Sequence, residues 1–201
     1  LCLFVLLWVV CLAMSAQNNM KTRYEKGRFK TEARIKTLAS KKNLSDLIPE
    51  IHTHLIRREI DSLDWLTKGL SGEGNSKSLI EVNYVNSTYD KRTGIFDLFV
   101  NVREGVFNRT FHNIKISVLM KYTNDVNGNP FMTIQLNEPN FLLKEAIGTI
   151  SISERYVVMR TSVRFGRFFD LFISRSNYNS VAEWRIQTAL ENMKTEVESW
   201  R

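Results

Sequence analysis

The sequence contains three histidines, whose imidazole nitrogens are common ligands of zinc ions. His52 and His54 are one residue apart within an amphipathic segment, and His112 is far from both along the chain. On a helix, the spacing of His52 and His54 places them roughly 200° apart around the axis, so they cannot share a metal ion. We therefore interpret all three as surface histidines and expect neither a metal site nor a cofactor.

Motifs of covalent catalysis and of phosphate binding do not occur in the sequence. It contains no Gly-x-Ser-x-Gly elbow, no phosphate-binding glycine loop and no metalloprotease helix. Paired acids of the glycosidase type cannot be recognised in this way, because the two carboxylates can be far apart along the chain. We expect a protein that is not an enzyme, and a hydrolase of extracellular polymers is the third of our three hypotheses.

Positive charge is concentrated in one segment, from Lys21 to Lys42. The chain has a net charge of +7, and nine basic and two acidic residues in this segment account for all of it. Such a segment attracts polyanions, and we expect a sulfated glycosaminoglycan or an anionic lipid. Nucleic acid is not expected, since Tyr24 and Phe29 alone could stack on bases there. A solvated tail is the alternative interpretation. The candidate polyanion-binding residues are Lys21, Arg23, Lys26, Arg28, Lys30, Arg34, Lys36, Lys41 and Lys42.

Aromatic side chains are densest near residue 170. A cavity for an apolar ligand can form where a helix lies over a curved sheet, although ordinary core packing is the favoured interpretation of this cluster. The candidate apolar-ligand residues are Phe165, Phe168, Phe169, Phe172 and Trp184.

Three sequons for N-glycosylation occur, at Asn43, Asn86 and Asn108. Asn86 and Asn108 fall at predicted strand ends or in loops, where a glycan can be accommodated. Asn43 lies at a predicted helix start and could instead be the helix cap.

The elements that would position these residues follow from hydrophobic periodicity. Apolar residues at three- and four-residue spacing from Leu44 to Leu70 predict an amphipathic helix of about 25 residues that begins near Asn43 and ends at Gly69 or Gly72. Ser180 to Glu183 is a capping-box pattern, followed by an apolar stripe up to Trp200, so we expect a second long helix there.

Alternating polarity between turn residues predicts a β-rich middle. The predicted strands are Leu79 to Asn86, Ile95 to Arg103, Ile114 to Tyr122, Phe131 to Leu136, Ile147 to Ser153, Arg155 to Phe165 and Arg167 to Ser174. Short connections favour an antiparallel meander. The predicted fold class is therefore α+β, an antiparallel meander sheet of about six to seven strands flanked by a long N-terminal helix and a long C-terminal helix.

Residues 1–16 have the pattern of a secretory signal peptide. An apolar run from Leu1 to Ala13 is followed by Ser15 and Ala16 and then by polar residues, and cleavage is possible after either Ser15 or Ala16. Because position 1 is leucine and the basic n-region is missing, we expect the true reading frame to begin earlier. A membrane anchor and bacterial lipidation at Cys11 are the alternatives, but the run is shorter than the roughly 20 residues of a spanning helix.

The predicted domain organisation has three parts. These are the signal peptide at 1–16, a basic flexible arm at 17–42 and a single α+β domain at 43–201. Cys2 and Cys11, the two cysteines of the chain, lie in the signal peptide, so the mature chain can form no disulfide. We expect a secreted, extracellular protein that is not an integral membrane protein.

The overall pattern resembles the non-enzymatic immunosuppressant proteins of tick saliva. The resemblance rests on the signal segment, on the sequons Asn86-Ser87-Thr88 and Asn108-Arg109-Thr110, and on the segment from Ala182 to Trp200. It implies a salivary glycoprotein that binds a host protein or cell surface and dampens lymphocyte responses, and this is our first hypothesis. The second is a carrier of a lipid or another apolar ligand in an extracellular fluid or a bacterial envelope.

Overall fold

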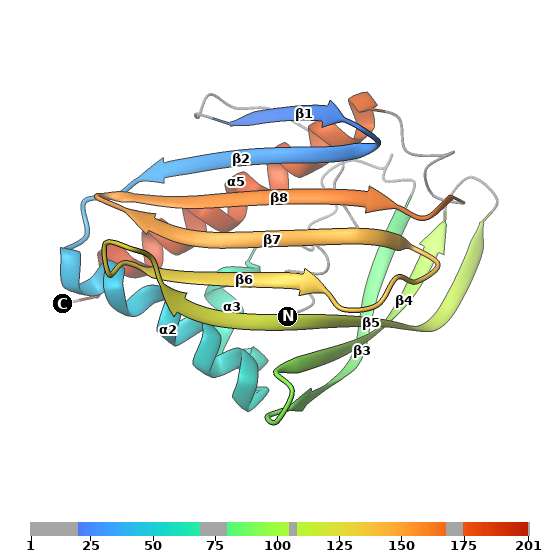
Figure 1. The fold of residues 1–201 in the computed structure, drawn as a ribbon, viewed down its shortest axis with the longest axis horizontal. Coiled ribbons are helices and arrows are strands. Elements are labelled where there is room, and N and C mark those ends of the chain that lie inside the picture. Colours follow the sequence, from blue (N-terminus) through green and yellow to red (C-terminus); the bar gives the residue numbers. More distant parts are fainter. Residues whose placement is uncertain (1–19, 69–79, 105–107, 168–174, 201) are drawn as a thin grey trace.

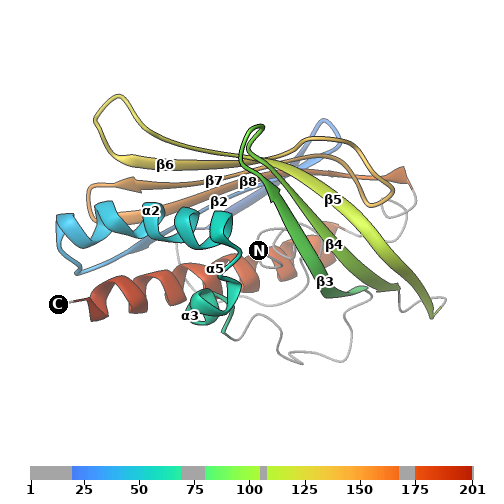
Figure 2. The same cartoon turned by 90° about the horizontal axis from the view of Figure 1, so that it is seen from below.

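The computed structural model describes residues 20–68, 80–104, 108–167 and 175–200, which form one antiparallel sheet with helices on one of its faces (Figures 1 and 2). The order of its eight strands is β1-β2-β8-β7-β6-β5-β4-β3. The strands are β1 (Lys21–Glu25), β2 (Arg28–Lys36), β3 (Ile80–Asp90), β4 (Ile95–Glu104), β5 (Arg109–Asn124), β6 (Pro130–Leu136), β7 (Leu143–Ser153) and β8 (Tyr156–Phe165). The helices are α2 (Lys41–Arg57), η1 (Ile60–Leu63), α3 (Asp64–Thr67) and α5 (Arg175–Ser199).

Strands β3 to β8 follow one another along the chain and in the sheet, as the alternating polarity predicts. On β4, the buried residues Phe96, Leu98 and Val100 alternate with partly exposed ones. Because side chains alternate between the two faces of a strand, this pattern gives one apolar face that packs inward. The predicted strand from Arg167 to Ser174 lies mostly outside the described residues.

The segment predicted to be a flexible basic arm forms a β-hairpin instead. β1 and β2 are joined by Lys26 and Gly27, whose φ angles of 49° and 75° are those of a tight hairpin turn. β2 then pairs antiparallel with β8, at the far end of the sheet from β3. The prediction of a flexible arm is wrong. The inward-facing positions of β2 include Thr31 and Ala33, which are only weakly hydrophobic and alternate with charged residues, so the sequence shows no clear strand pattern there.

The N-terminal helix is shorter than predicted, because α2 ends at Arg57. Arg58 has a φ of 63°, and the amide of Glu59 donates to the carbonyl of His54 at 3.0 Å, which closes the helix in a Schellman-type cap. The apolar periodicity continues past this point because Leu63 and Leu66, on η1 and α3, are also buried against the core. Periodicity alone therefore did not reveal the turn at Arg58.

α5 begins at Arg175, five residues before the predicted capping box, and crosses the sheet beneath β2 and β8 (Figure 2). α2 packs mainly on β6 and β7. Both helices lie on the same side, where their apolar side chains and those of the sheet form one core. Among the described residues, no helix covers the other face of the sheet, which we call the open face (Figure 2).

The predicted fold class is wrong in its details. The sheet has eight strands rather than six to seven, it is not a simple meander because β1 and β2 join it beside β8, and the N-terminal helix is short. The long C-terminal helix is present, with 25 residues.

Candidate anion-binding site

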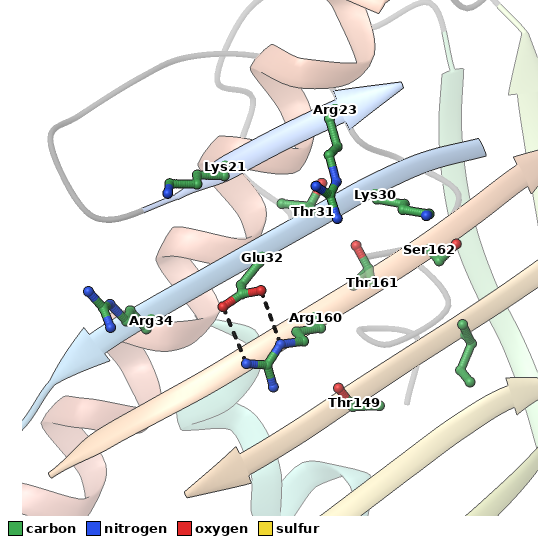
Figure 3. A pocket seen from close by; sticks show the side chains of 11 residues that line it. Lys21, Arg23, Lys30, Thr31, Glu32, Arg34, Thr149, Arg160, Thr161 and Ser162 are labelled. Carbon is green, nitrogen blue, oxygen red and sulfur yellow. Dashed lines mark hydrogen bonds and ion pairs between the residues drawn. The ribbon is translucent and has the colours of Figure 1, made fainter. Parts of the chain in front are cut away.

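A hollow of about 650 Å³ lies on the open face, above β1, β2, β7 and β8 (Figure 3). Its lining contains five cationic side chains and one carboxylate, together with hydroxyl groups and one aliphatic side chain. The lining residues are Lys21, Arg23, Lys30, Thr31, Glu32, Arg34, Ile147, Thr149, Arg160, Thr161 and Ser162. The lining thus carries a net positive charge.

Strand alternation and register bring these charges together. Lys30, Glu32 and Arg34 alternate along β2 with buried residues, so they point to the open face. In register, Glu32 is opposite Lys21 of β1 on one side and opposite Arg160 of β8 on the other. Directly opposed residues of neighbouring strands share a face, so three strands contribute charges to one place.

Glu32, the carboxylate of the lining, is bound by Arg160. The Nε of Arg160 lies 3.1 Å from a carboxylate oxygen of Glu32 (Figure 3). The hydrogen bond from Arg160, together with the nearby charges of Arg34 and Lys21, holds the pKa of Glu32 below its ordinary value. Glu32 is therefore an anion at neutral pH, and it marks the place where an anionic ligand would meet Arg160.

The other ion pairs of the hollow lie at its rim. Lys30 and Arg23 contact the carboxylate of Glu25 at 2.8 and 3.1 Å. Arg34 lies over the ring of Tyr156, 5.3 Å from its centre. Water screens ion pairs as exposed as those of Glu25, so they are weak, and a ligand anion can replace the carboxylate of Glu25 at little cost.

The structure divides the nine predicted polyanion-binding residues into two groups. Lys21, Arg23, Lys30 and Arg34 line the hollow. The other five do not: Lys26 is in the hairpin turn, Arg28 pairs with Glu145, Lys36 ends β2, and Lys41 and Lys42 begin α2.

Sequence reasoning missed the contribution of the distant strands. Arg160, Thr149 and Ser162 line the hollow from β8 and β7, more than a hundred residues from the hairpin. The alternation of Arg160 and Ser162 with buried residues was visible in the sequence, but nothing local indicated that β8 pairs with β2.

The predicted apolar-ligand cluster is not brought together as a site in the described residues. Phe165 is buried and packs edge-on against Phe29 and Tyr178. Trp184, on α5, is half-buried and has the guanidinium of Arg185 over its ring at 5.5 Å. Phe168, Phe169 and Phe172 lie outside the described residues.

The three sequons have different surroundings. The side-chain amide nitrogen of Asn43 donates to the carbonyl of Trp200 at 2.8 Å, so a glycan on this nitrogen would displace a bond between α2 and the end of α5. Asn86 is exposed beside a bulge of the edge strand β3, and Asn108 is exposed and accepts from Arg103. Asn43 is therefore the least suitable acceptor of the three.

The histidines are dispersed. His52 stacks on Tyr122 with ring centres 5.4 Å apart, and burial lowers its pKa. His54 contacts Glu59, and His112 is exposed on β5. In the described ranges, no three His, Cys, Asp or Glu side chains lie close enough together to hold a metal ion, and no helix there is long and apolar enough to span a bilayer. The predicted signal peptide, 1–16, lies outside those ranges.

No protein-family model and no curated protein matches the chain. Solved structures with a similar outline include the di-domain ARO/CYC protein BexL of the BE-7585A biosynthetic pathway, with 9% identity, a TM-score of 0.43 and 88% of this chain covered. The protein XoxI from Bacillus cereus has 12% identity, a TM-score of 0.45 and coverage of 85% of this chain and 96% of its own. Major latex-like protein 151 from Panax ginseng has 7% identity, a TM-score of 0.42 and coverage of 84% and 97%.

This chain spans about half of the BexL chain, 52%. At such low identity and TM-scores, these structures assign no function and no residue role to this protein. The resemblance to tick salivary immunosuppressants likewise stays a prediction from the sequence.

Proposed function

We propose that this protein is a non-enzymatic binding protein that holds an anionic ligand in the hollow on the open face. The observation that carries the proposal is the lining itself, in which five cations from three strands surround one carboxylate. A concave site with one sign of charge focuses the electrostatic field and attracts ligands of the opposite sign. With the predicted secretion, the ligand would be met outside the cell.

Binding rather than catalysis is favoured by what the lining contains. Among the residues that the structure describes, Glu32 is the one carboxylate of the lining, and it is held by Arg160, so these residues offer no second acid to complete a glycosidase pair. Hydroxyls of Thr149 and Ser162 supply hydrogen bonds. Such a set can orient an anion, and it contains no group that activates a nucleophile.

Two substitutions in the hollow should change anion binding in opposite directions. Arg160→Gln removes a cation and leaves Glu32 facing the ligand, so we expect about tenfold weaker binding. Glu32→Gln removes the negative charge beside Arg160 and releases Arg160, so binding should tighten by about fivefold, which corresponds to roughly 1 kcal/mol. The measurement is calorimetric titration of each variant with sucrose octasulfate, a compact polyanion, at low ionic strength.

Lys42→Gln is the matched control for these variants. It removes one positive charge from the N-terminal turn of α2, outside the lining, and should leave the affinity unchanged. If Lys42→Gln weakened binding as much as Arg160→Gln, the net charge of the protein and not the hollow would be responsible, and the proposal would be lost.

The second candidate function is that of a carrier of an apolar ligand on the helix side of the sheet. It is motivated by the arrangement of helices on one side of a curved sheet, where β4 and β5 present an apolar row of Phe96, Leu98, Val100, Ile116 and Val118. The main helix contacts are with β2, β6, β7 and β8, whereas Figure 2 shows β3 to β5 bending over the same side.

Native mass spectrometry of the protein purified from a eukaryotic secretion host tests this candidate. A carrier should retain a lipid-sized mass that is lost after solvent extraction, with thermal stability falling on its removal. A single protein mass before and after extraction, with unchanged stability, would eliminate the carrier function and leave the hollow as the candidate site.

A further inference from the structure

The positive charges of the hollow are spread along the strands and do not converge on one point. Lys30 and Arg34 are four residues apart on the same face of β2, which corresponds to about 14 Å at the usual rise of an extended strand. Figure 3 shows their charged ends at opposite ends of the hollow, with Arg160 between them. A single phosphate or sulfate, bound at hydrogen-bond distance, would contact one part of this row and leave the rest without a ligand.

The remainder of the lining fits sugar rings better than nucleobases. Ser162 lies opposite Lys30 and Thr149 lies opposite Arg160 in the sheet, and the hydroxyl of each can both donate and accept hydrogen bonds. No aromatic residue of the described ranges lines the hollow, and the guanidinium of Arg34 lies over the nearby ring of Tyr156. Stacking platforms, which single-stranded nucleic acids require, are therefore missing from this lining.

The composition of the hollow favours a polymer chain over a membrane surface. Its cations follow the strands β1, β2 and β8 in rows, as an extended chain of sulfates would require. Surfaces that insert into the headgroup layer also present several large apolar side chains. In the part of the chain that the structure describes, Ile147 is the one large apolar residue of the lining, with 39% of its surface exposed.

We propose that the ligand of the hollow is an extended sulfated polysaccharide chain that lies along β2 and β8, with sulfate groups contacting Lys30, Arg160 and Arg34 in succession. This inference rests on the proposed function and specifies its ligand class. Lys21 and Arg23, on the edge strand β1, flank the same path from one side. Binding exchanges the contacts of Glu25 and Glu32 for contacts with sulfates and needs no rearrangement of the backbone.

The test is a length series of heparin-derived oligosaccharides, from disaccharide to decasaccharide, titrated into the mature chain. We expect the affinity to rise by about tenfold or more until the oligosaccharide spans about 14 Å, the distance from Lys30 to Arg34, and then to level off. The logarithm of the binding constant should fall with the logarithm of the salt concentration with a slope of about three to five, one for each ion contact.

Variants at the two ends of the row make the test specific. Lys30→Gln and Arg34→Gln should each weaken binding of the longest oligosaccharide by about fivefold, and their effects should multiply, because sites this far apart act independently. Sucrose octasulfate, which is too compact to reach both ends, should lose affinity with one of the two variants and not with both. Lys42→Gln, outside the hollow, should have no effect.

Three outcomes would count against the inference. An affinity independent of oligosaccharide length, or equal affinity for chemically desulfated oligosaccharides, would overturn the extended sulfated chain while leaving anion binding intact. Tight binding to phosphatidylserine vesicles that Arg34→Gln abolishes, without binding to oligosaccharides, would assign the hollow to a membrane. If no oligosaccharide, octasulfate or vesicle bound at low salt, the proposed function itself would fail.

Discussion

Tyr178→Ala is expected to lower the free energy of unfolding by about 3–5 kcal/mol, the usual cost of removing a buried aromatic ring. Tyr178 is fully buried on α5, and its ring stacks on Phe29 of β2 with ring centres 4.0 Å apart. The ring of Phe165 meets it edge-on at 6.0 Å. Because three elements meet at this ring, the cavity left by alanine cannot close by the movement of one side chain.

The measurement is urea unfolding followed by circular dichroism, and the melting temperature should fall by roughly 10 °C. Tyr156→Ala is the control, since Tyr156 is a tyrosine of β8 that is half-buried on the open face, and it should cost much less. Similar losses for the two variants would show that α5 is not anchored to β2 through Tyr178.

This packing also supports the site. Phe29 faces α5, while its neighbour Lys30 faces the hollow on the other side of the sheet. Packing of α5 against β2 therefore fixes the strand that carries two of the cations. Tyr178→Ala should therefore also weaken anion binding, although Tyr178 is on the opposite side of the sheet.

Gly166→Ala should destabilise the protein by about 3 kcal/mol, near the upper end of the usual range for overpacking. A Cβ atom at this position would lie 2.2 Å from the carbonyl oxygen of Phe141. The backbone cannot easily retreat, because the amide of Gly166 donates to the carbonyl of Leu142 at 2.8 Å. The clash is thus with the carbonyl of Phe141, next to the carbonyl of Leu142 that accepts this hydrogen bond.

Gly128→Ala separates this clash from simple backbone strain. Gly128 has a φ of 77° and no atom within 4 Å of an added Cβ, so alanine there costs about 1–2 kcal/mol through its conformation alone. Thermal unfolding of the two variants should give the larger loss for Gly166→Ala. A smaller loss at Gly166 than at Gly128 would mean that the chain near Phe141 moves aside.

Local patterns in the sequence were sufficient for most of the sheet. Alternation along Phe96 to Val102 identified β4, because one apolar face repeats every two residues wherever a strand covers a core. Periodicity did not predict where α2 ends. The chain before and after the turn at Arg58 presents apolar residues to the same core, and the helical spacing of those residues continues through the turn. Periodicity also failed at β2, where Thr31 and Ala33 occupy two of the inward positions and charged residues occupy the outward ones.

The sequence by itself determined that the positive charge of this protein is concentrated between Lys21 and Lys42, since charge depends on composition alone. Only the tertiary structure decided that four of those cations meet Arg160 in one hollow, while Lys41 and Lys42 lie elsewhere. The physical reason is that alternation fixes the face on which a side chain lies, whereas the pairing of β2 with β8 depends on contacts between strands more than a hundred residues apart.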